Sequence, residues 1–165
     1  MSTVTLKGTP HRISGGLPQV GSAAPDFRLV DSQLQDHRLS DYAQRRLLLN
    51  IVPSLDTGVC AASAKRFDEM ARAHAGTVFA TVSADLPFAQ ERFCSGEGIG
   101  NVVMLSAMRG PEFARDYGVR IEEGPFEGLC ARSVVIIGTD GRVAYTQLVP
   151  EIAQEPDYDE VEGAL

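Results

Sequence analysis

Two continuous apolar runs with a helical segment between them constrain the fold of this chain more than any other feature. Residues 46–52, RLLLNIV, and residues 77–83, TVFATVS, are typical of strands that are buried on both faces of a sheet. Between them, residues 59–75 carry apolar side chains at mostly helical spacing, and Gly76 stands where a glycine often ends a helix. A strand, a helix and a second strand in this order predict an α/β sheet.

The remaining segments continue this alternation. Residues 2–14 predict a small N-terminal β-hairpin, because weakly alternating side chains surround Gly8, Thr9 and Pro10. The Asp-Gly step within GTDG, residues 138–141, is a strong signal for a second hairpin. Further strands are expected at 27–30, 101–105, 133–137 and 142–148, and further helices at 87–93 and 111–117.

This order of elements defines the expected fold class. Strands and helices that alternate and then finish in a hairpin predict an α/β fold with a central mixed sheet flanked by helices, compatible with a thioredoxin-like fold. The length of 165 residues suits a single domain, residues 1–165, in which residues 1–20 form an N-terminal hairpin extension.

Composition and charge exclude several classes of function. The net charge is -7 and no run of lysine or arginine interrupts it, so we expect neither nucleic acid nor an anionic membrane surface as a partner. No stretch approaches the roughly 20 apolar residues that span a bilayer. The N-terminus, MSTVTLKGTPHRISGG, also lacks the apolar segment of a secretory signal. We therefore expect a cytoplasmic protein.

Cysteine and histidine are too few and too scattered to build a structural framework. The three cysteines, at positions 60, 94 and 130, are an odd number and do not predict a disulfide scaffold. The three histidines do not stand at zinc-ligand spacing relative to them. We expect no metal and no cofactor, so the thiols themselves become the candidates for chemistry.

Cys60 stands where a loop turns into a helix, in the stretch PSLDTGVCAAS. Asp56 and Thr57 are both candidate N-caps, and with Thr57 as the cap Cys60 takes the third helical position. Its sulfur then lies among unpaired backbone N–H groups at the positive end of the helix dipole, and both favour the thiolate. The alternative is a buried structural thiol that packs as a small apolar side chain.

A resemblance to a known family favours the reactive thiol. Pro53, Thr57 and Cys60 match the PxxxTxxC motif of the peroxiredoxins. Together with SADLPFAQERFC, GLCARSVVII and EPDY, the chain resembles the thiol peroxidase subfamily, the atypical two-cysteine peroxiredoxins, over nearly its whole length. The resemblance implies a thioredoxin fold with an N-terminal hairpin, reduction of hydrogen peroxide and organic hydroperoxides, thioredoxin as the reductant, and a homodimer.

The same resemblance implies roles for residues around Cys60. The Thr57 hydroxyl is expected to bond both the sulfur and the attacked oxygen, and the N–H groups of Val59 and Cys60 to face the peroxide. Arg132 resembles the active-site arginine of the family, which holds the sulfur anionic and contacts the peroxide. Pro53, which has no N–H group, is expected to shield the site from water.

A second thiol is needed because attack on a peroxide leaves Cys60 as a sulfenic acid, which overoxidises unless it is captured. Cys94 is the candidate, and the resemblance implies an intramolecular Cys60–Cys94 disulfide. Because a disulfide requires Cα atoms within about 7 Å, we expect one or both helices to unwind locally. Cys130 is not part of the cysteine pair that is usual in the family. It is either an inert thiol or, if its side chain points to the same side of the chain as Arg132, a partner of Cys60 in an off-pathway disulfide.

Three other readings compete with the peroxidase. A dithiol oxidoreductase is disfavoured because the chain has no CxxC motif. A peroxide sensor or redox relay would use the same first step, and a binding module with inert thiols would use none.

The preferred peroxide stays open: Phe27, Phe88 and Phe93 either line a pocket for organic hydroperoxides or belong to the core. The C-terminus, DEVEGAL, is shorter and more acidic than the closing helix that is usual in the family it resembles, which puts a final helix in question.

Overall fold

The structure, a computed structural model, describes residues 2–165. The strands are β1 (Thr3–Leu6), β2 (Thr9–Arg12), β3 (Arg28–Val30), β4 (Asp36–Arg38), β5 (Arg46–Ile51), β6 (Thr77–Ser83), β7 (Val103–Ser106), β8 (Ser133–Ile137) and β9 (Val143–Leu148). The helices are α1 (Gly58–Ala73), α2 (Pro87–Glu97), α3 (Phe113–Asp116) and α4 (Tyr158–Gly163), with 3-10 turns η1 (Leu39–Tyr42) and η2 (Ala107–Arg109).

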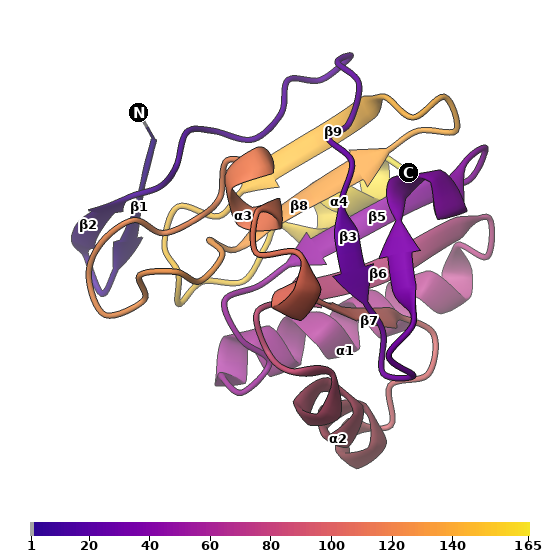
Figure 1. Ribbon diagram of the computed structural model, residues 1–165, viewed down its shortest axis with the longest axis horizontal. Helices are drawn as coiled ribbons and strands as arrows, with labels where there is room; N and C mark the ends of the chain where they lie inside the picture. The colour runs from indigo at the N-terminus through magenta and orange to yellow at the C-terminus, as the bar shows by residue number, and fades with distance from the viewer. Residues whose placement is uncertain (1) are drawn as a thin grey trace.

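Within the described residues, β1 and β2 form a separate hairpin, and the other strands form a seven-stranded mixed sheet (Figure 1). The strand order in that sheet is β4-β3-β7-β6-β5-β8-β9. Strands β5, β6 and β7 are parallel, whereas β8 and β9 on one side and β3 and β4 on the other are antiparallel to their neighbours. This arrangement is a thioredoxin-like fold.

Strands β5 and β6 lie at the centre of the sheet because they are apolar along most of their length. Leu47, Leu48, Leu49 and Ile51 of β5 are all fully buried, as expected for a strand that is covered on both faces. Parallel pairing of β5 with β6 requires the chain to cross over one face, and α1 makes this crossover. The loop 52–57 therefore carries the end of β5 directly to the first turn of α1.

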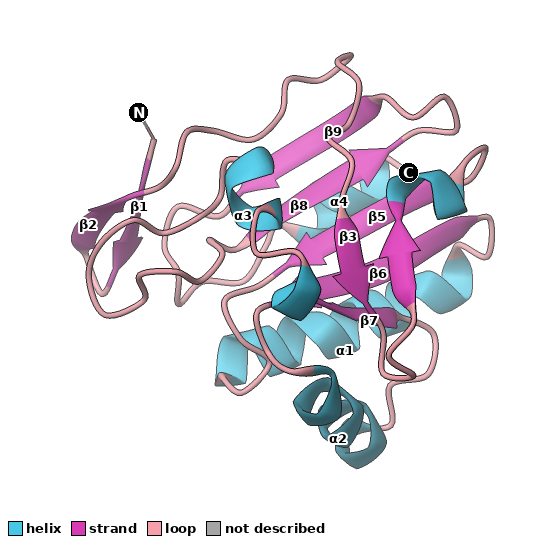
Figure 2. Ribbon diagram, viewed as in Figure 1, coloured by secondary structure: helices cyan, strands magenta, loops and turns pink. Residues whose placement is uncertain are grey.

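Helices cover the two faces of the sheet unequally (Figure 2). On one face, Phe67 of α1 and Val161 of α4 pack in one cluster with Leu48 of β5. On the other face, Phe113 of α3 packs in a second cluster with Val4 of the hairpin. The long helix α1, whose first turn carries Cys60, thus packs on the first face.

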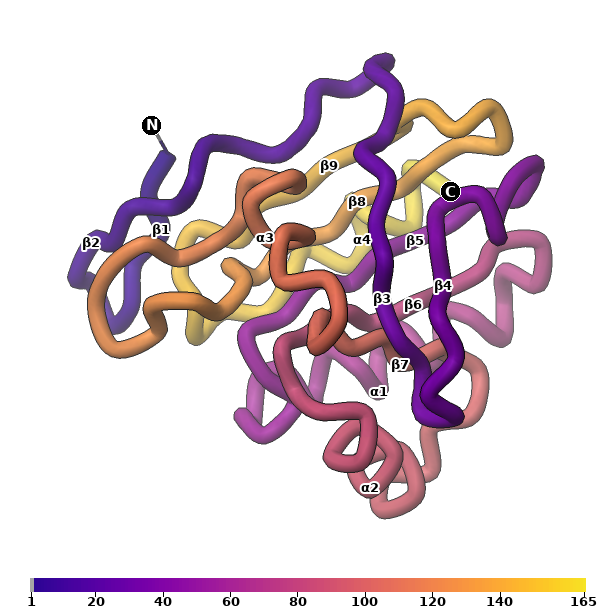
Figure 3. Tube along the Cα trace, viewed as in Figure 1, coloured from indigo at the N-terminus to yellow at the C-terminus, as the bar shows by residue number. Residues whose placement is uncertain are grey.

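The N-terminal segment runs along the outer edge of the sheet beside β9 (Figure 3). The Gly21 N–H donates to the Val143 carbonyl at 2.8 Å, and Ala23 bridges Arg142. The β1–β2 hairpin itself lies at one end of the molecule, beyond the ends of the central strands (Figure 1). Among residues 2–165, no helix has the length and apolar character needed to cross a membrane.

Most expected elements are present, and the differences are confined to a few of them. The strands expected at 46–52, 77–83 and 133–137 are confirmed to within one residue. Helix α1 ends earlier than expected, with His74 rather than Gly76 in the C-cap position. The helix expected over 111–117 is reduced to the four residues of α3. The short strand β4 was not expected, and the final helix, in question from the sequence, is present as α4.

Candidate active site

Cys60 occupies the third position of α1, as the sequence predicts. Thr57 is the N-cap, and its Oγ1 accepts a hydrogen bond from the Cys60 N–H at 3.3 Å. The same hydroxyl donates to the Ser54 carbonyl at 3.3 Å. The structure therefore uses Thr57 to hold the helix start and the preceding turn together, and the Cys60 N–H that was expected to face a peroxide is already bonded to Thr57.

Arg132 brings a positive charge to the Cys60 sulfur. Its Nη2 donates to Cys60 Sγ at 3.1 Å, although the two residues are far apart in the sequence. Both side chains are buried, with 1% of Arg132 and none of Cys60 exposed. A guanidinium cannot lose its charge in a protein, so this contact suits a sulfur that carries a negative charge.

The carbonyl of Ile152 fixes the orientation of the guanidinium. It accepts from Arg132 Nε at 3.1 Å and from Nη2 at 3.0 Å. Among the described residues, the third nitrogen, Nη1, is buried without a hydrogen-bond partner. A buried, unpartnered donor costs stability unless something else satisfies it, so Nη1 is the atom of this guanidinium that still has a free hydrogen-bond donor.

The loop before Cys60 is tied to the segment that precedes α2. Asp85 accepts from the Ser54 hydroxyl at 2.8 Å and from the Leu55 N–H at 2.7 Å. The Ser83 hydroxyl, at the end of β6, also donates to Asp85, at 2.8 Å. Pro53 is buried at the start of this loop. These bonds hold the loop before Cys60 against the segment that leads from β6 into α2, the helix that carries Cys94.

A surface pocket lies between this loop and α2. Its volume is about 610 Å³. Its lining includes Leu55 and Asp85 from the loop side and Phe93 from α2. Of the three phenylalanines considered from the sequence, Phe93 lines this pocket, whereas Phe88 is 64% exposed. Phe27 packs in the cluster on the opposite face of the sheet from Cys60, so of the two expectations for this residue the structure favours the core.

Cys94 lies in the second half of α2, half-buried against the cluster that contains Cys60. Burial, together with the negative charges of Glu91 and Asp68, raises the pKa of the Cys94 thiol to about 11. At neutral pH this thiol is therefore protonated in the folded helix. The thiolate is the attacking form of a cysteine, so Cys94 is a poor nucleophile while it stays in this environment.

The C-terminal end of α2 holds the backbone of Cys94. The Cys94 carbonyl accepts from the N–H groups of Gly98, which adopts a left-handed conformation, and Ile99. Just beyond this cap, Asp68 of α1 accepts from the N–H of Gly100 at 3.2 Å and of Asn101 at 2.7 Å. Asp68 thus fastens the end of α2 to the helix that carries Cys60.

Cys130 lies away from both other thiols. It packs in the cluster on the opposite face of the sheet from Cys60 and is 2% exposed. Burial raises the pKa of its thiol to about 12. The argument that Cys130 shares a side with Arg132 was wrong, because the chain at Cys130 bridges Arg120 before β8 begins. The structure favours the inert packing thiol.

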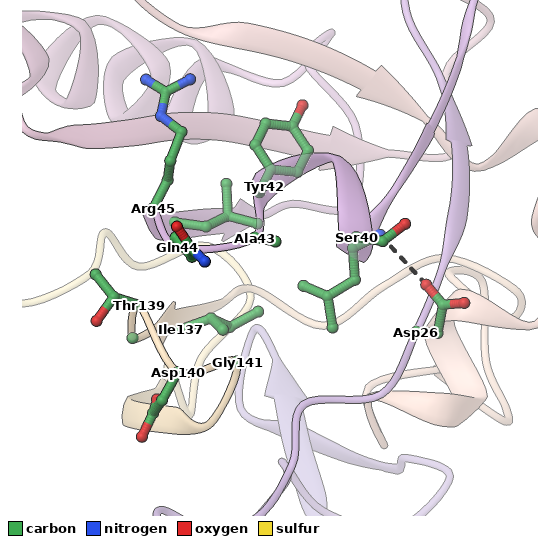
Figure 4. Close-up of a pocket in the computed structure, with 13 residues that line it drawn as sticks. Asp26, Ser40, Tyr42, Ala43, Gln44, Arg45, Ile137, Thr139, Asp140 and Gly141 are labelled. Atoms are coloured by element: carbon green, nitrogen blue, oxygen red, sulfur yellow. Dashed lines mark hydrogen bonds between the residues drawn. The ribbon is translucent and has the colours of Figure 1, made fainter.

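A second pocket, of about 390 Å³, lies near the start of β5 and contains none of the expected site residues (Figure 4). It is lined by Tyr42 and Arg45 near η1 and by Asp140 of the β8–β9 turn. The Asp26 carboxylate accepts from the Leu39 N–H at 3.2 Å at its rim. Cys60 follows the opposite end of β5, so this pocket is separate from the thiol site.

The fold and the site together define a class of protein. A buried thiol at the start of the helix that follows a central strand, beside an arginine, is the arrangement of a thiol-based redox protein on a thioredoxin-like fold. The Redoxin family matches residues 19–162 of this chain. The chain therefore belongs to the redoxin family.

Individual relatives agree with this assignment. Thiol peroxidases of Mycobacterium tuberculosis and Mycobacterium bovis are each 52% identical over 100% of this chain and 99% of their own length. The structure of a peroxiredoxin-like protein from Aquifex aeolicus is 43% identical, has a TM-score of 0.93, and covers 99% of this chain and 95% of its own. The resemblance to the thiol peroxidase subfamily is thereby confirmed.

A more distant structure supports the fold alone. A thiol peroxidase from Chromobacterium violaceum is 23% identical with a TM-score of 0.90, over 98% of this chain and 93% of its own.

Sequence reasoning missed three supporting groups: the Ile152 carbonyl, Asp85 and Asp68. A backbone carbonyl leaves no signal in residue types. Asp85, within SADLPF, follows a buried strand, and Asp68 stands next to Phe67 on the apolar side of α1, which is a weak sign of a buried hydrogen-bonding role.

Proposed function

We propose that this protein is a thiol-dependent peroxidase that reduces hydrogen peroxide and organic hydroperoxides. The observation that carries the proposal is the 3.1 Å contact between Arg132 Nη2 and Cys60 Sγ at the start of α1, in a chain 52% identical to proteins named thiol peroxidase. The contact places the sulfur where a negative charge on it is stabilised by both a guanidinium and a helix N-terminus.

In the first step, the Cys60 thiolate attacks the terminal oxygen of the peroxide. The S–O bond forms as the O–O bond breaks, and the departing alkoxide or hydroxide takes up a proton to leave as alcohol or water. Cys60 becomes a sulfenic acid. Nη1 of Arg132 is buried without a partner among the described residues, which supports a role in which it donates to a peroxide oxygen as negative charge develops there.

Thr57 and Pro53 shape the approach to the sulfur. Thr57 holds the first turn of α1 through its bonds to the Cys60 N–H and the Ser54 carbonyl. Its hydroxyl reaches the substrate if it exchanges one of these bonds for a peroxide oxygen. Pro53 is buried and has no N–H group that needs water, which supports its role as a shield.

In the second step, the sulfur of Cys94 attacks Sγ of the Cys60 sulfenic acid. A disulfide forms, the S–O bond breaks, and water leaves. Because Cys94 is held by the α2 cap and its thiol is protonated at neutral pH, this step requires α2 to open. The buried residues of α2 are Pro87 and Gln90, so the helix has little apolar contact to lose on opening.

The remaining assignments concern the partners and the setting. We propose that thioredoxin reduces the Cys60–Cys94 disulfide by thiol–disulfide exchange, which requires a reducing compartment and supports a cytoplasmic location. We also propose a single domain over residues 1–165 and a homodimer. Exposed apolar side chains at Leu86, Phe88 and Met108 support the dimer. The segments of Leu86 and Met108 are held together by Ser106, whose hydroxyl accepts from the Met108 N–H and donates to the carbonyl of the residue before Leu86.

A steady-state assay with thioredoxin, its reductase and NADPH tests the proposal. We expect many turnovers with both hydrogen peroxide and cumene hydroperoxide. A peroxide sensor would stop after about one equivalent, because its disulfide waits for a protein partner. A binding module with inert thiols would consume none, and would leave Cys60 slow to alkylate at neutral pH.

A further inference from the structure

The β1–β2 hairpin is connected to Arg132 by a short chain of hydrogen bonds. The connection passes through the segment 150–152, which follows β9. Ile152 accepts two bonds from the Arg132 guanidinium through its carbonyl, at 3.1 and 3.0 Å. On its other side, the Ile152 N–H donates to the carbonyl of Thr5 in β1 at 2.8 Å. One peptide unit of Thr5 therefore lies two hydrogen bonds from the arginine that contacts Cys60.

Two further sets of bonds fix the segment 150–152 to the hairpin. The Thr5 N–H donates to the Pro150 carbonyl at 2.8 Å, so Thr5 bonds on both sides of Glu151 as in a short parallel ladder. The Glu151 carboxylate accepts from the N–H groups of Lys7 at 2.9 Å and Gly8 at 3.3 Å, and from the Thr5 hydroxyl. The Glu151 carboxylate thus binds the turn of the hairpin, while the Pro150 carbonyl and the Ile152 N–H on either side of Glu151 bind β1.

The charge on Glu151 matters for these bonds. The Thr5 hydroxyl first, and the Lys7 N–H next, hold the pKa of the Glu151 carboxyl below its ordinary value. The carboxylate is therefore ionised at neutral pH, and bonds from N–H and O–H donors to an ionised acceptor are about twice as strong as neutral ones.

We propose that the β1–β2 hairpin positions the guanidinium of Arg132 against Cys60, through the backbone of Ile152 and the carboxylate of Glu151. Thr5 and Glu151 are positioning residues in this arrangement, because they reach the reacting sulfur only through Ile152 and Arg132. The inference rests on the proposed role of Arg132 in peroxide reduction. It gives the N-terminal hairpin, which lies outside the central sheet, a part in the reaction.

The chain offers a matched pair of carboxylates for the test. Glu123 also binds the backbone of the hairpin, accepting from the Arg12 N–H at 2.9 Å, and its pKa is likewise held below the ordinary value, first by that N–H. Glu123 lies between α3 and β8 and bonds Arg12 of β2, so it is not part of the segment 150–152. The variants E151Q and E123Q therefore remove similar charges from the same hairpin, but E151Q alone disturbs the path to Arg132.

The measurement is the rate constant for oxidation of Cys60 by a single addition of hydrogen peroxide, in full-length protein and without reductant. We expect E151Q to lower this rate constant by about threefold to tenfold and E123Q to leave it unchanged. Thr5→Val, which removes the hydroxyl bond to Glu151 and keeps the backbone bonds, should lower it less than E151Q. Equal rate constants for E151Q and wild type, or equal losses in E151Q and E123Q, would overturn the proposal.

A double-mutant cycle separates positioning from general stability. If Glu151 acts through the guanidinium, E151Q should have no further effect on the rate constant in an Arg132→Met background. An undiminished effect in that background would contradict the proposal. If Arg132→Met alone left the rate constant unchanged, the proposed role of Arg132 would fail first, so the two failures are distinguishable.

Discussion

Nη2 of Arg132 lies 3.1 Å from Sγ of Cys60, and the same nitrogen also donates to the carbonyl of Ile152 at 3.0 Å. The guanidinium is thus held on one side by backbone and faces the sulfur on the other. Among residues 2–165, no acidic side chain pairs with this guanidinium, so its positive charge beside the thiol is held by the neutral carbonyl of Ile152.

Replacing Cys60 by serine should abolish thioredoxin-dependent peroxide turnover. A serine hydroxyl is a far weaker nucleophile than a thiolate at neutral pH. Cys130→Ser is the matched control, because Cys130 is also buried but packs on the other face of the sheet; it should retain full turnover. Activity that survives in Cys60→Ser would show that the reactive thiol is another one.

Replacing Cys94 by serine should separate the two chemical steps. The variant should consume about one equivalent of peroxide and then stop, because Cys60 still reacts but nothing captures its sulfenic acid. Mass spectrometry after one addition of peroxide should find Cys60 as the sulfenic acid or a higher oxide. Continued turnover with thioredoxin would exclude Cys94 as the resolving thiol.

Replacing Arg132 by methionine should slow the oxidation of Cys60 by about a hundredfold or more, since loss of one well-placed donor to a developing charge has that effect. Arg132→Lys keeps the charge but loses the planar group that bonds both Ile152 and Cys60. The rate constant should be measured across pH. If the methionine variant reaches the wild-type value at high pH, Arg132 acts on the thiolate alone and does not contact the peroxide.

Alkylation of Cys94 in the reduced, folded protein should keep rising with pH. Burial and the nearby carboxylates raise the pKa of this thiol to about 11, so its thiolate fraction should increase about tenfold for each pH unit between pH 8 and 10. Iodoacetamide labelling followed by peptide mapping measures this directly. A plateau near pH 8.5, the ordinary range of a cysteine, would mean that Cys94 is not held in this environment.

Asp68→Asn should speed this labelling of Cys94. The change weakens the bonds to the N–H groups of Gly100 and Asn101 that fasten the end of α2, and it removes a negative charge that contributes to the raised pKa of Cys94. We expect an increase of about tenfold. Glu69→Gln, on the exposed side of α1, is the control and should change nothing. Labelling of Cys130, which is buried, reports global unfolding in the same sample.

The sequence predicted the central strands well because continuous apolar runs leave them few alternatives. It also placed Cys60 correctly, since the spacing from Thr57 sets the helix start. The four-residue α3 and the short β4 depend on tertiary contacts, as in the pairing of β4 with β3, and such contacts override local propensity. The choice between core and pocket for Phe27 stayed open, because the face of the sheet that a residue covers depends on tertiary packing, which one sequence does not reveal.

The site was predictable only in part, for a related reason. The motif residues Thr57 and Cys60 are local, so their contact follows from helix geometry. The contact of Arg132 with Cys60 was expected from the resemblance alone, because residues distant in sequence meet through the sheet. The support from Ile152 comes from backbone atoms, and these carry no signature in a sequence.

The most direct test of the account is a rapid-mixing experiment on the reduced wild-type protein with one equivalent of hydrogen peroxide, quenched at intervals and mapped under non-reducing conditions. The account predicts that Cys60 sulfenic acid appears first and is replaced by a peptide linked through Cys60 and Cys94, with Cys130 still alkylatable. The linked peptide should disappear when reduced thioredoxin is added. A linkage through Cys130, a disulfide between two chains, or a disulfide that thioredoxin leaves intact would contradict it.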